Sequence, residues 1–329
     1  MNRRSAIQRA AATVVAFSTA DAVFAQQEPW RPSRPITMFV PGAPGSGVDI
    51  LARELGDRLG AVLKQQVIVE NKPGGSGAIA TKAAVRAPAD GQALLYTNAG
   101  NTVMAASLVK TLPYDVLHDL VPVAQTVSGG IFLLSSNDFP AKNLTELVRH
   151  VKANPGKFSY GTSGIGSVGH LTMEWLKRKT GMDIAHVPYR QAPQLLTELA
   201  AGTLKLGWID PAAPLAFIET HKVRPIAVTG ATRLPHSPSV PTMGEQGYPF
   251  ETVGWFGVFA PKGTPAQIVQ TLAGEINRIQ AQPDMVARIT SLNVSPPTVN
   301  TPEQFGRVVT ADFQTWKRIV ADAGIKLDN

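Results

Sequence analysis

The sequence predicts an α/β protein built of two lobes. Apolar runs of strand length alternate with amphipathic stretches of helical period along most of the 329 residues. Two stretches more than a hundred residues apart, FVPGAPGSGVDIL and SYGTSGIGSVGHL, share one design, in which a strand runs through a Gly- and Ser-rich loop into a helix. Because the chain is long enough for two ordinary domains, we expect one such stretch in each lobe.

Residues 1–25 are predicted to be a secretory signal peptide. Three arginines lie within the first nine residues, an apolar stretch covers 10–22, and Val23 and Ala25 supply small side chains before a cleavage point. The apolar stretch is too short for a stable membrane span. We therefore expect export to the periplasm, by the general secretory route or, given the arginine pair, by the twin-arginine route.

Composition argues against several classes of function. The chain has no cysteine, so disulfides and thiol catalysis are excluded. The formal net charge is +7, but no long basic run occurs and aromatic residues make up only 7%, which argues against a nucleic-acid surface. The six histidines are scattered without the spacing of a metal site, so we expect neither a metal nor a cofactor.

The N-terminal part begins with a strand at 36–40 that ends at Pro41. The loop that follows leads to a helix at 50–63, because Leu51, Leu55 and Leu59 recur on one face. The same criteria predict strands at 66–69 and 93–97, a helix at 77–87, and a β-rich run over 123–134 that Gly129 and Gly130 interrupt.

The central part opens with a helix at 144–153, for which Asn143 and Glu146 form a capping pattern. Strand-like and helix-like segments then continue to alternate, so a mostly parallel sheet is expected. The remaining segments are strands at 158–160, 184–187, 204–209 and 225–228, and helices at 169–180, 194–201, 265–281 and 302–323.

The two Gly- and Ser-rich loops predict a binding site for a small anion. Each loop ends at a helix N-terminus, where free backbone N–H groups and the helix dipole favour negative charge. Ligands of α/β proteins bind at the carboxyl ends of strands and between domains. The candidate binding residues are Ala43, Gly45, Ser46, Gly47, Asp49, Asn98, Ser163, Gly164, Gly166, Ser167, His170 and Asp210.

Three of these candidates also have a structural interpretation. Asp49 stands where an N-cap would stand, and we favour capping over direct contact with the ligand. Asp210 precedes Pro211, so it either forms a turn or accepts a hydrogen bond from a ligand amine or hydroxyl. His170 either packs beside the loop or, with Ser167, forms the dyad of a hydrolase, although no G-x-S-x-G elbow is present.

Nucleotide binding has weaker support. The segment 164–169 spells G-x-G-x-x-G, but Asp183 precedes the next strand, whereas a dinucleotide fold needs an acidic residue at the end of that strand. The first loop has no lysine after its glycines, as a nucleotide P-loop requires. An anion-binding loop is the better interpretation of both segments.

Several longer stretches occur in the order typical of one family: RPITMFVPGAPGSGVDILARELGDRLG, VIVENKPGGSGAIAT, YGTSGIGSVGHL, HVPYRQAPQLLTELAAG and WFGVFAPKGTP. On these stretches the chain resembles the Bug or TctC-like solute receptors of tripartite tricarboxylate transporters. The resemblance implies a type II periplasmic-binding-protein fold with two crossover strands, near 123–127 and 227–230, and a central cleft. Lobe one is then expected at 28–125 plus 231–329, and lobe two at 126–230.

The resemblance also implies a function without catalysis. A small carboxylate would be held between the loops 41–49 and 161–170, largely by backbone groups and waters, as the lobes close about a hinge. The receptor, a monomer, would then dock on a membrane permease. A sensor subunit that presents its closed form to a receptor kinase is the alternative, because both roles need the same trap.

The chain departs from the family pattern on these loops. Pro44 stiffens the first loop, Val48 stands where a threonine is common, and Gln191 replaces a glycine. A lost hydroxyl at position 48 would remove one hydrogen bond, which Ser46 could restore. These changes predict a ligand that differs from a generic dicarboxylate.

Overall fold

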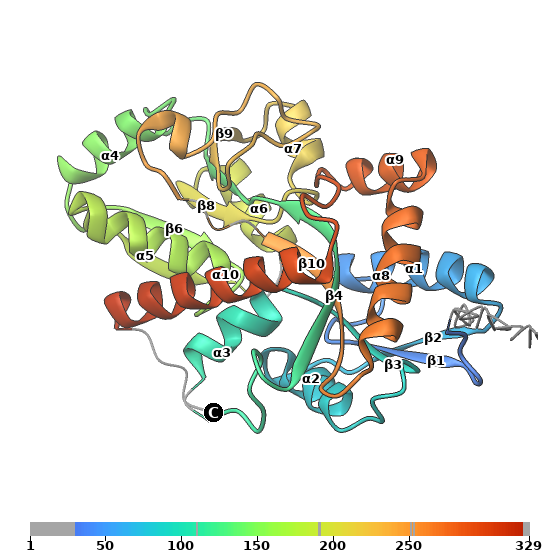
Figure 1. Cartoon of the computed structure of the whole chain (residues 1–329). Helices are drawn as coiled ribbons and strands as arrows, with labels where there is room; N and C mark the ends of the chain where they lie inside the picture. The colour runs from blue at the N-terminus through green and yellow to red at the C-terminus, as the bar shows by residue number, and fades with distance from the viewer. Residues whose placement is uncertain (1–29, 110, 190–191, 251, 253, 325–329) are drawn as a thin grey trace, which may run out of the picture.

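The computed structural model describes residues 30–324 except 110, 190, 191, 251 and 253. The signal peptide expected at 1–25 and the departure at Gln191 therefore lie outside the described residues. The chain forms two five-stranded sheets, each flanked by helices, and so has two α/β lobes (Figure 1). Among the described residues, no helix combines the length and apolar character needed to cross a membrane.

Sheet one has the strand order β2-β1-β3-β10-β4, and sheet two the order β7-β6-β8-β5-β9. The strands of sheet one are β1 (Ile36–Val40), β2 (Val67–Asn71), β3 (Ala93–Asn98), β4 (Leu120–Gly129) and β10 (Gly254–Pro261). Those of sheet two are β5 (Phe132–Ser135), β6 (Ser159–Thr162), β7 (Ala185–Pro188), β8 (Leu206–Ile209) and β9 (Arg224–Val228).

Both sheets are mixed, which corrects the expectation of a mostly parallel sheet. In sheet one, β1 runs parallel to β2 and β3, whereas β10 runs antiparallel to β3 and β4. In sheet two, β6 is parallel to β7 and β8, and β5 is antiparallel to β8 and β9. The cause lies in the connections: β4 leaves sheet one toward the second lobe and β10 returns from it, so these neighbours run in opposite directions.

The two crossings between the lobes lie side by side. The chain passes from β4 to β5 through Gly130 and Ile131, and it returns at Gly254, which pairs with Gly129 in the sheet register. A Cβ at Gly130 would lie 1.9 Å from the Thr229 carbonyl oxygen, so only glycine fits there. The Ile131 N–H donates to Thr229 Oγ1 at 3.0 Å, which ties the outgoing strand to the end of β9.

The segment between β9 and β10 packs on the second lobe. Leu234 and Val240 share a buried cluster with Phe132 of β5 and Val228 of β9. The Met243 N–H donates to the Val228 carbonyl at 2.8 Å. We therefore propose a lobe boundary near residue 254 in place of the expected residue 231.

The expected helices are present, with ends that differ by at most three residues from the expected ones. Asn143 caps its helix as expected, because its side chain accepts the Glu146 N–H. Three helices, α3, α7 and α9, were not expected; the first two are short and the third follows directly after α8. The helices are α1 (Gly47–Leu63), α2 (Ala78–Val85), α3 (Ala105–Leu108), α4 (Leu144–Lys152), α5 (Val168–Thr180), α6 (Ala192–Ala201), α7 (Leu215–Glu219), α8 (Ala266–Gln280), α9 (Pro283–Ser291) and α10 (Pro302–Ala323).

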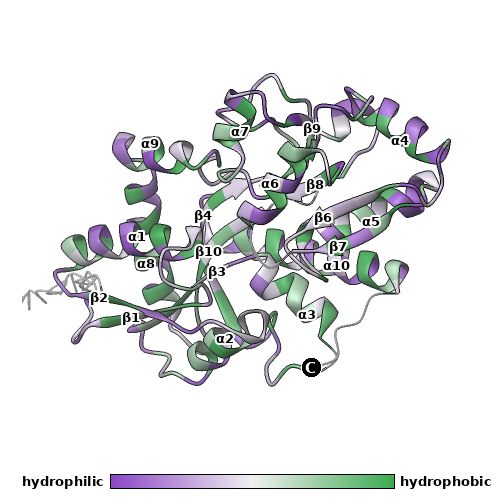
Figure 2. Ribbon diagram, turned by 180° about the vertical axis from the view of Figure 1, so that it is seen from behind, coloured by the Kyte–Doolittle hydropathy of each residue, from purple (hydrophilic) through white to green (hydrophobic). Residues whose placement is uncertain are grey.

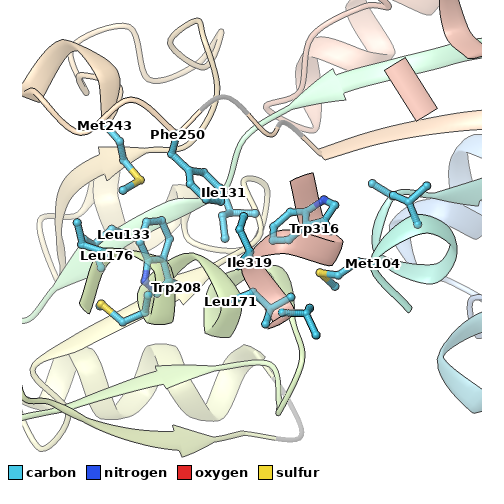
Figure 3. Close-up of a cluster of buried hydrophobic side chains, with 14 of the residues drawn as sticks. Met104, Ile131, Leu133, Leu171, Leu176, Trp208, Met243, Phe250, Trp316 and Ile319 are labelled. Atoms are coloured by element: carbon cyan, nitrogen blue, oxygen red, sulfur yellow. The ribbon is translucent and has the colours of Figure 1, made fainter. Parts of the chain in front are cut away.

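One buried apolar cluster continues from lobe to lobe. In Figure 3, Trp316 and Ile319 of α10 lie near Leu171 of α5 and Phe250 of the return segment. The same cluster contains Met104 of the first lobe. Helix α10 therefore packs against both lobes. Helices at the outside of the molecule, such as α4 and α9, show alternating hydrophilic and hydrophobic turns, as helices with one buried face should (Figure 2).

Candidate functional site

The first loop ends in a helix N-terminus with free donors. Ser46, not Asp49, is the N-cap of α1, and its side chain makes no capping hydrogen bond. Within the part of the chain that the structure describes, the N–H groups of Gly47, Val48 and Asp49 have no hydrogen-bond partner. Three backbone donors therefore stand at the positive end of the α1 dipole.

Asp49 braces the first loop from inside. Asp49 is 3% exposed, and its carboxylate accepts hydrogen bonds from the Gly45 N–H at 2.8 Å, Arg53 Nε–H at 3.0 Å and Asn71 Nδ2–H at 2.8 Å. Burial opposes ionisation, but the hydrogen bonds from Arg53, Gly45 and Asn71 outweigh it and hold the pKa of Asp49 below its usual value. This geometry supports the structural interpretation of Asp49.

The loop uses two of its own amides internally. The Gly45 N–H is bound by Asp49, and the Ser46 N–H donates to the Ala43 carbonyl at 3.1 Å. These two amides were expected to hold the ligand together with those of Ala43 and Gly47. In this structure the Gly47 N–H is free, and Val48 and Asp49 add two free donors that were not expected.

The side chains of Ser46 and Val48 lie inside the loop. A Cβ at Gly42 would come within 2.3 Å of Ser46 Oγ and 2.4 Å of Val48 Cγ1. Val48 is 6% exposed and belongs to the apolar core of the first lobe. A hydroxyl at position 48 would therefore face the core, so the departure from the family pattern does not remove a ligand contact in this arrangement.

The second loop repeats the design of the first. Ser167 caps α5 by accepting the His170 N–H at 3.3 Å, and Thr162 Oγ1 lies 3.2 Å from the Gly164 nitrogen, whose N–H it accepts. Ser163 is exposed. Among the described residues, no partner is found for the N–H groups of Ser163, Ile165, Val168 and Gly169.

His170 holds this loop through a ring nitrogen. Its Nδ1 accepts the Gly166 N–H at 3.0 Å, and its ring stacks on His186 with centroids 4.0 Å apart. Burial lowers the pKa of His170, and burial together with the neighbouring His170 lowers the pKa of His186 to about 4. Both imidazoles are therefore neutral near pH 7, and Nδ1 of His170 stays free to accept.

The Ser–His hydrolase has no geometric support. Ser167 Oγ bonds the backbone of His170, and the imidazole bonds the backbone of Gly166. No hydrogen bond joins the Ser167 hydroxyl to the His170 ring in the described part of the chain, whereas a nucleophile and its base require one.

Replacing His170 by leucine is expected to lower the free energy of unfolding by about 1–3 kcal/mol, because the buried Gly166 N–H then loses its acceptor. His170→Asn should cost less, since the asparagine carbonyl can occupy the place of Nδ1. Denaturant unfolding of both variants checks this. Equal losses for leucine and asparagine would show that the Gly166 hydrogen bond does not matter.

Asn98 and Asp210 lie at the ends of strands beside the two loops. Asn98 ends β3, a parallel neighbour of β1, and its Oδ1 accepts the Asn101 N–H at 2.9 Å, so it shapes the turn that follows. Asp210 follows β8, a parallel neighbour of β6. Each therefore lies at the sheet edge that carries a loop.

Asp210 combines access to solvent with close protein surroundings. Its side chain is exposed and has no hydrogen-bond partner among the described residues, yet the surrounding protein raises the pKa of its carboxyl by desolvation. The carboxyl is free to accept a hydrogen bond from a ligand.

The loop residues suit an anion rather than a metal. Neither 41–49 nor 161–170 contains a lysine or arginine, so backbone N–H groups supply the positive potential. No group of histidine, aspartate and glutamate side chains in the described ranges could hold a metal ion.

A surface groove of about 510 Å³ lies away from the two loops, between α10 and residues 116–122.

Sequence reasoning missed the residues that brace the loops: Arg53, Asn71, Thr162 and His186. Asn71 ends β2 and reaches Asp49 because β2 pairs with β1, and His186 reaches Thr162 because β7 pairs with β6. Strand pairing brings Asn71 and His186 to the loops, and no local sequence signal marks those two. Arg53 is different, because it follows Asp49 by four residues on α1, a spacing that could have identified it.

The chain has two α/β lobes joined by two adjacent crossings, and each lobe has a Gly-rich loop before a helix N-terminus. This arrangement defines the class of two-lobed solute-binding proteins. The model of the tripartite tricarboxylate transporter family receptor, TctC, matches residues 51–325, and the chain belongs to this family. Protein BugT of Bordetella pertussis is 34% identical over 298 residues, which are 90% of this chain and 91% of BugT.

Solved structures show the same fold. The R. palustris protein Rpa4515 with adipate is 32% identical, with a TM-score of 0.76, and the match covers 90% of this chain and 99% of that one. MatC from Rhodopseudomonas palustris with bound malate is 29% identical, with a TM-score of 0.74, and the match covers 88% and 99%. The periplasmic binding protein BugD is 32% identical, with a TM-score of 0.74, over 90% of this chain and 99% of BugD.

Proposed function

We propose that this chain is a periplasmic receptor that captures a small carboxylate between its lobes and delivers it to the permease of a tripartite tricarboxylate-type transporter. One observation carries the proposal: each lobe has a Gly-rich loop before a helix, with unpartnered backbone N–H groups at the helix N-terminus. Such donors bind an anion without a fixed cation, which would slow release.

We assign the free N–H groups of the two loops to different parts of the ligand. The N–H groups of Gly47 and its successors would hold one carboxylate, and those of Ser163 and Val168, with the Ser163 hydroxyl, would hold the ligand from the second lobe. Asp210 would accept a hydrogen bond from a hydroxyl or amine between them. Ala43, Gly45, Ser46, Asp49, Asn98, Gly164, Gly166, Ser167 and His170 would shape the site.

Two similar structures support a carboxylate ligand. Rpa4515 is described with adipate and MatC with malate, and both acids carry two carboxylates. A dicarboxylate can offer one carboxylate to each loop. For this chain we propose the same class of ligand, together with export by the leader at 1–25 and action as a monomer.

A thermal-shift titration of the leaderless protein, unfolded and refolded to remove carried-over ligand, tests the proposal. The panel is adipate, malate, succinate and aspartate, each beside its diamide. A bound acid at a hundred times its Kd stabilises the native state by about 2.7 kcal/mol, so the melting temperature should rise by several degrees. A rise with the diamides as well, or with none of the acids, would contradict a carboxylate trap of this class.

The same set of acids tests whether Asp210 accepts a hydrogen bond from the ligand. Malate differs from succinate by one hydroxyl, so a hydrogen bond to Asp210 should make malate the better ligand. Copurification of the loaded protein with membrane partners then separates delivery to a permease from signalling through a receptor kinase.

A further inference from the structure

Asn293 connects the lobes through a fully buried side chain. It follows α9 and is 0% exposed. Its Oδ1 accepts the His236 N–H at 2.9 Å, and its Nδ2 donates to the Pro211 carbonyl at 3.1 Å and lies 3.5 Å from Ser237 Oγ. All three partners belong to the second lobe, because Pro211 follows β8 and the other two lie on the return segment that packs there.

The backbone around Asn293 is anchored to the first lobe. Ser295 exchanges two backbone hydrogen bonds with Ser128 of β4, at 2.9 and 2.7 Å. The Thr298 N–H donates to Gln125 Oε1 at 3.0 Å, also on β4. Asn293 therefore stands where a segment fixed to lobe one reaches lobe two.

This contact lies beside the crossing between the lobes. A Cβ at Gly129 would come within 3.1 Å of Val294 Cγ1, so the segment lies against the glycine pair through which the chain passes to the second lobe. A rotation of one lobe about that crossing would change the distances from Asn293 to its three partners.

The conformation of Asn293 separates the roles of backbone and side chain. Its φ of 55° lies in the left-handed region, which glycine adopts more readily than any other residue. A glycine would therefore serve the backbone at least as well. What asparagine adds is the set of hydrogen bonds to the second lobe.

We propose that Asn293 is a positioning residue that sets the angle between the lobes and holds the turn formed by Asp210 and Pro211. The ligand-affinity part of this proposal rests on the proposed function, whereas the part about lobe angle does not. A buried amide that lost its partners would leave unsatisfied groups on both sides, so the hydrogen bonds favour the lobe arrangement of this structure. Without them the population shifts toward other lobe angles.

A distance measurement tests the proposal without any ligand. The chain has no cysteine, so Asp57→Cys on α1 and Glu219→Cys on α7, both exposed, give two defined sites for spin labels. Asn293→Gly keeps the left-handed backbone and removes only the side chain. We expect the distance distribution between the labels to shift or broaden in Asn293→Gly. A distribution identical to that of the parent would overturn the proposal.

Affinity and stability give the second readout. With malate and adipate as probes, Asn293→Gly should bind roughly tenfold more weakly than the parent, through faster dissociation. The control is Asn143→Ala, which removes the N-cap of α4 and should lower the melting temperature without changing affinity or distances. If Asn293→Gly behaved like Asn143→Ala, Asn293 would have a structural role only. If neither acid bound the parent protein, the proposed ligand class would be wrong. The distance measurement would still test the role of Asn293 in setting the lobe angle.

Discussion

Gly47→Leu is expected to abolish carboxylate binding while the protein stays folded. Gly47 is exposed, a Cβ there meets nothing within 4 Å, and its backbone is not in the left-handed region. Because Cα–Cβ bonds tilt toward the helix N-terminus, the leucine would project in front of the free N–H groups of α1. Affinity should fall at least about 100-fold, while the free energy of unfolding changes by roughly 0.5 kcal/mol or less. Calorimetric titration and denaturant unfolding measure the two effects.

The matched control for Gly47→Leu is Gly274→Leu. Gly274 lies in α8, is exposed, and likewise has open space around its Cβ position. Its substitution should leave binding unchanged, because Gly274 lies in the middle of α8 and belongs to neither loop. If Gly47→Leu bound carboxylates as well as the control did, the α1 N-terminus would not belong to the site.

Asp312→Asn is expected to stabilise the protein at pH 8 by about 2–3 kcal/mol. Asp312 of α10 is 9% exposed and accepts Trp255 Nε1–H at 2.7 Å. Burial raises its pKa to about 6, although the Trp255 hydrogen bond works in the opposite direction. At pH 8 the folded protein therefore holds a buried charge at a cost, and asparagine accepts the same hydrogen bond without a charge.

The pH dependence fixes the sign of this effect. Between the unfolded value of 3.8 and about 6, the folded chain binds more protons at Asp312 than the unfolded chain does. The contribution of Asp312 to stability is therefore greatest below pH 3.8 and is lost as the pH rises through 6. The advantage of Asp312→Asn should be absent near pH 4 and complete at pH 8, which unfolding curves at the two values measure. If Asp312→Asn were less stable than the parent at pH 8, the surrounding protein would have to stabilise the charged form of Asp312.

The local elements could be predicted because their signals are local. β1 was expected with its observed bounds, and α5 begins one residue before its expected start, because apolar period and glycine loops depend on neighbouring residues only. α1 was expected at 50–63 with Asp49 as its N-cap, but it starts at Gly47. Capping depends on the φ and ψ angles of the loop, which place Ser46 at the N-cap.

The strand β10 was not predicted from the sequence. Its residues were noted as a family motif and were not assigned to a strand, although β10 lies between β3 and β4 in sheet one. Its position follows from the return of the chain out of the second lobe. Such long-range pairing leaves no periodic pattern that would identify its partners.

By itself, the sequence determined the α/β class, the two strand–loop–helix designs and the resemblance to the family to which the chain belongs. Tertiary structure decided which loop amides are free. Asp49 and His170 each accept an amide N–H four residues earlier, and the groups that contact their side chains come from distant strands, Asn71 of β2 and His186 of β7. The same holds for Asn293, whose partners lie more than fifty residues away in the chain. The physical reason is common to all three: a hydrogen bond is made or left open by atoms that meet in space, and the sequence records only neighbours along the chain.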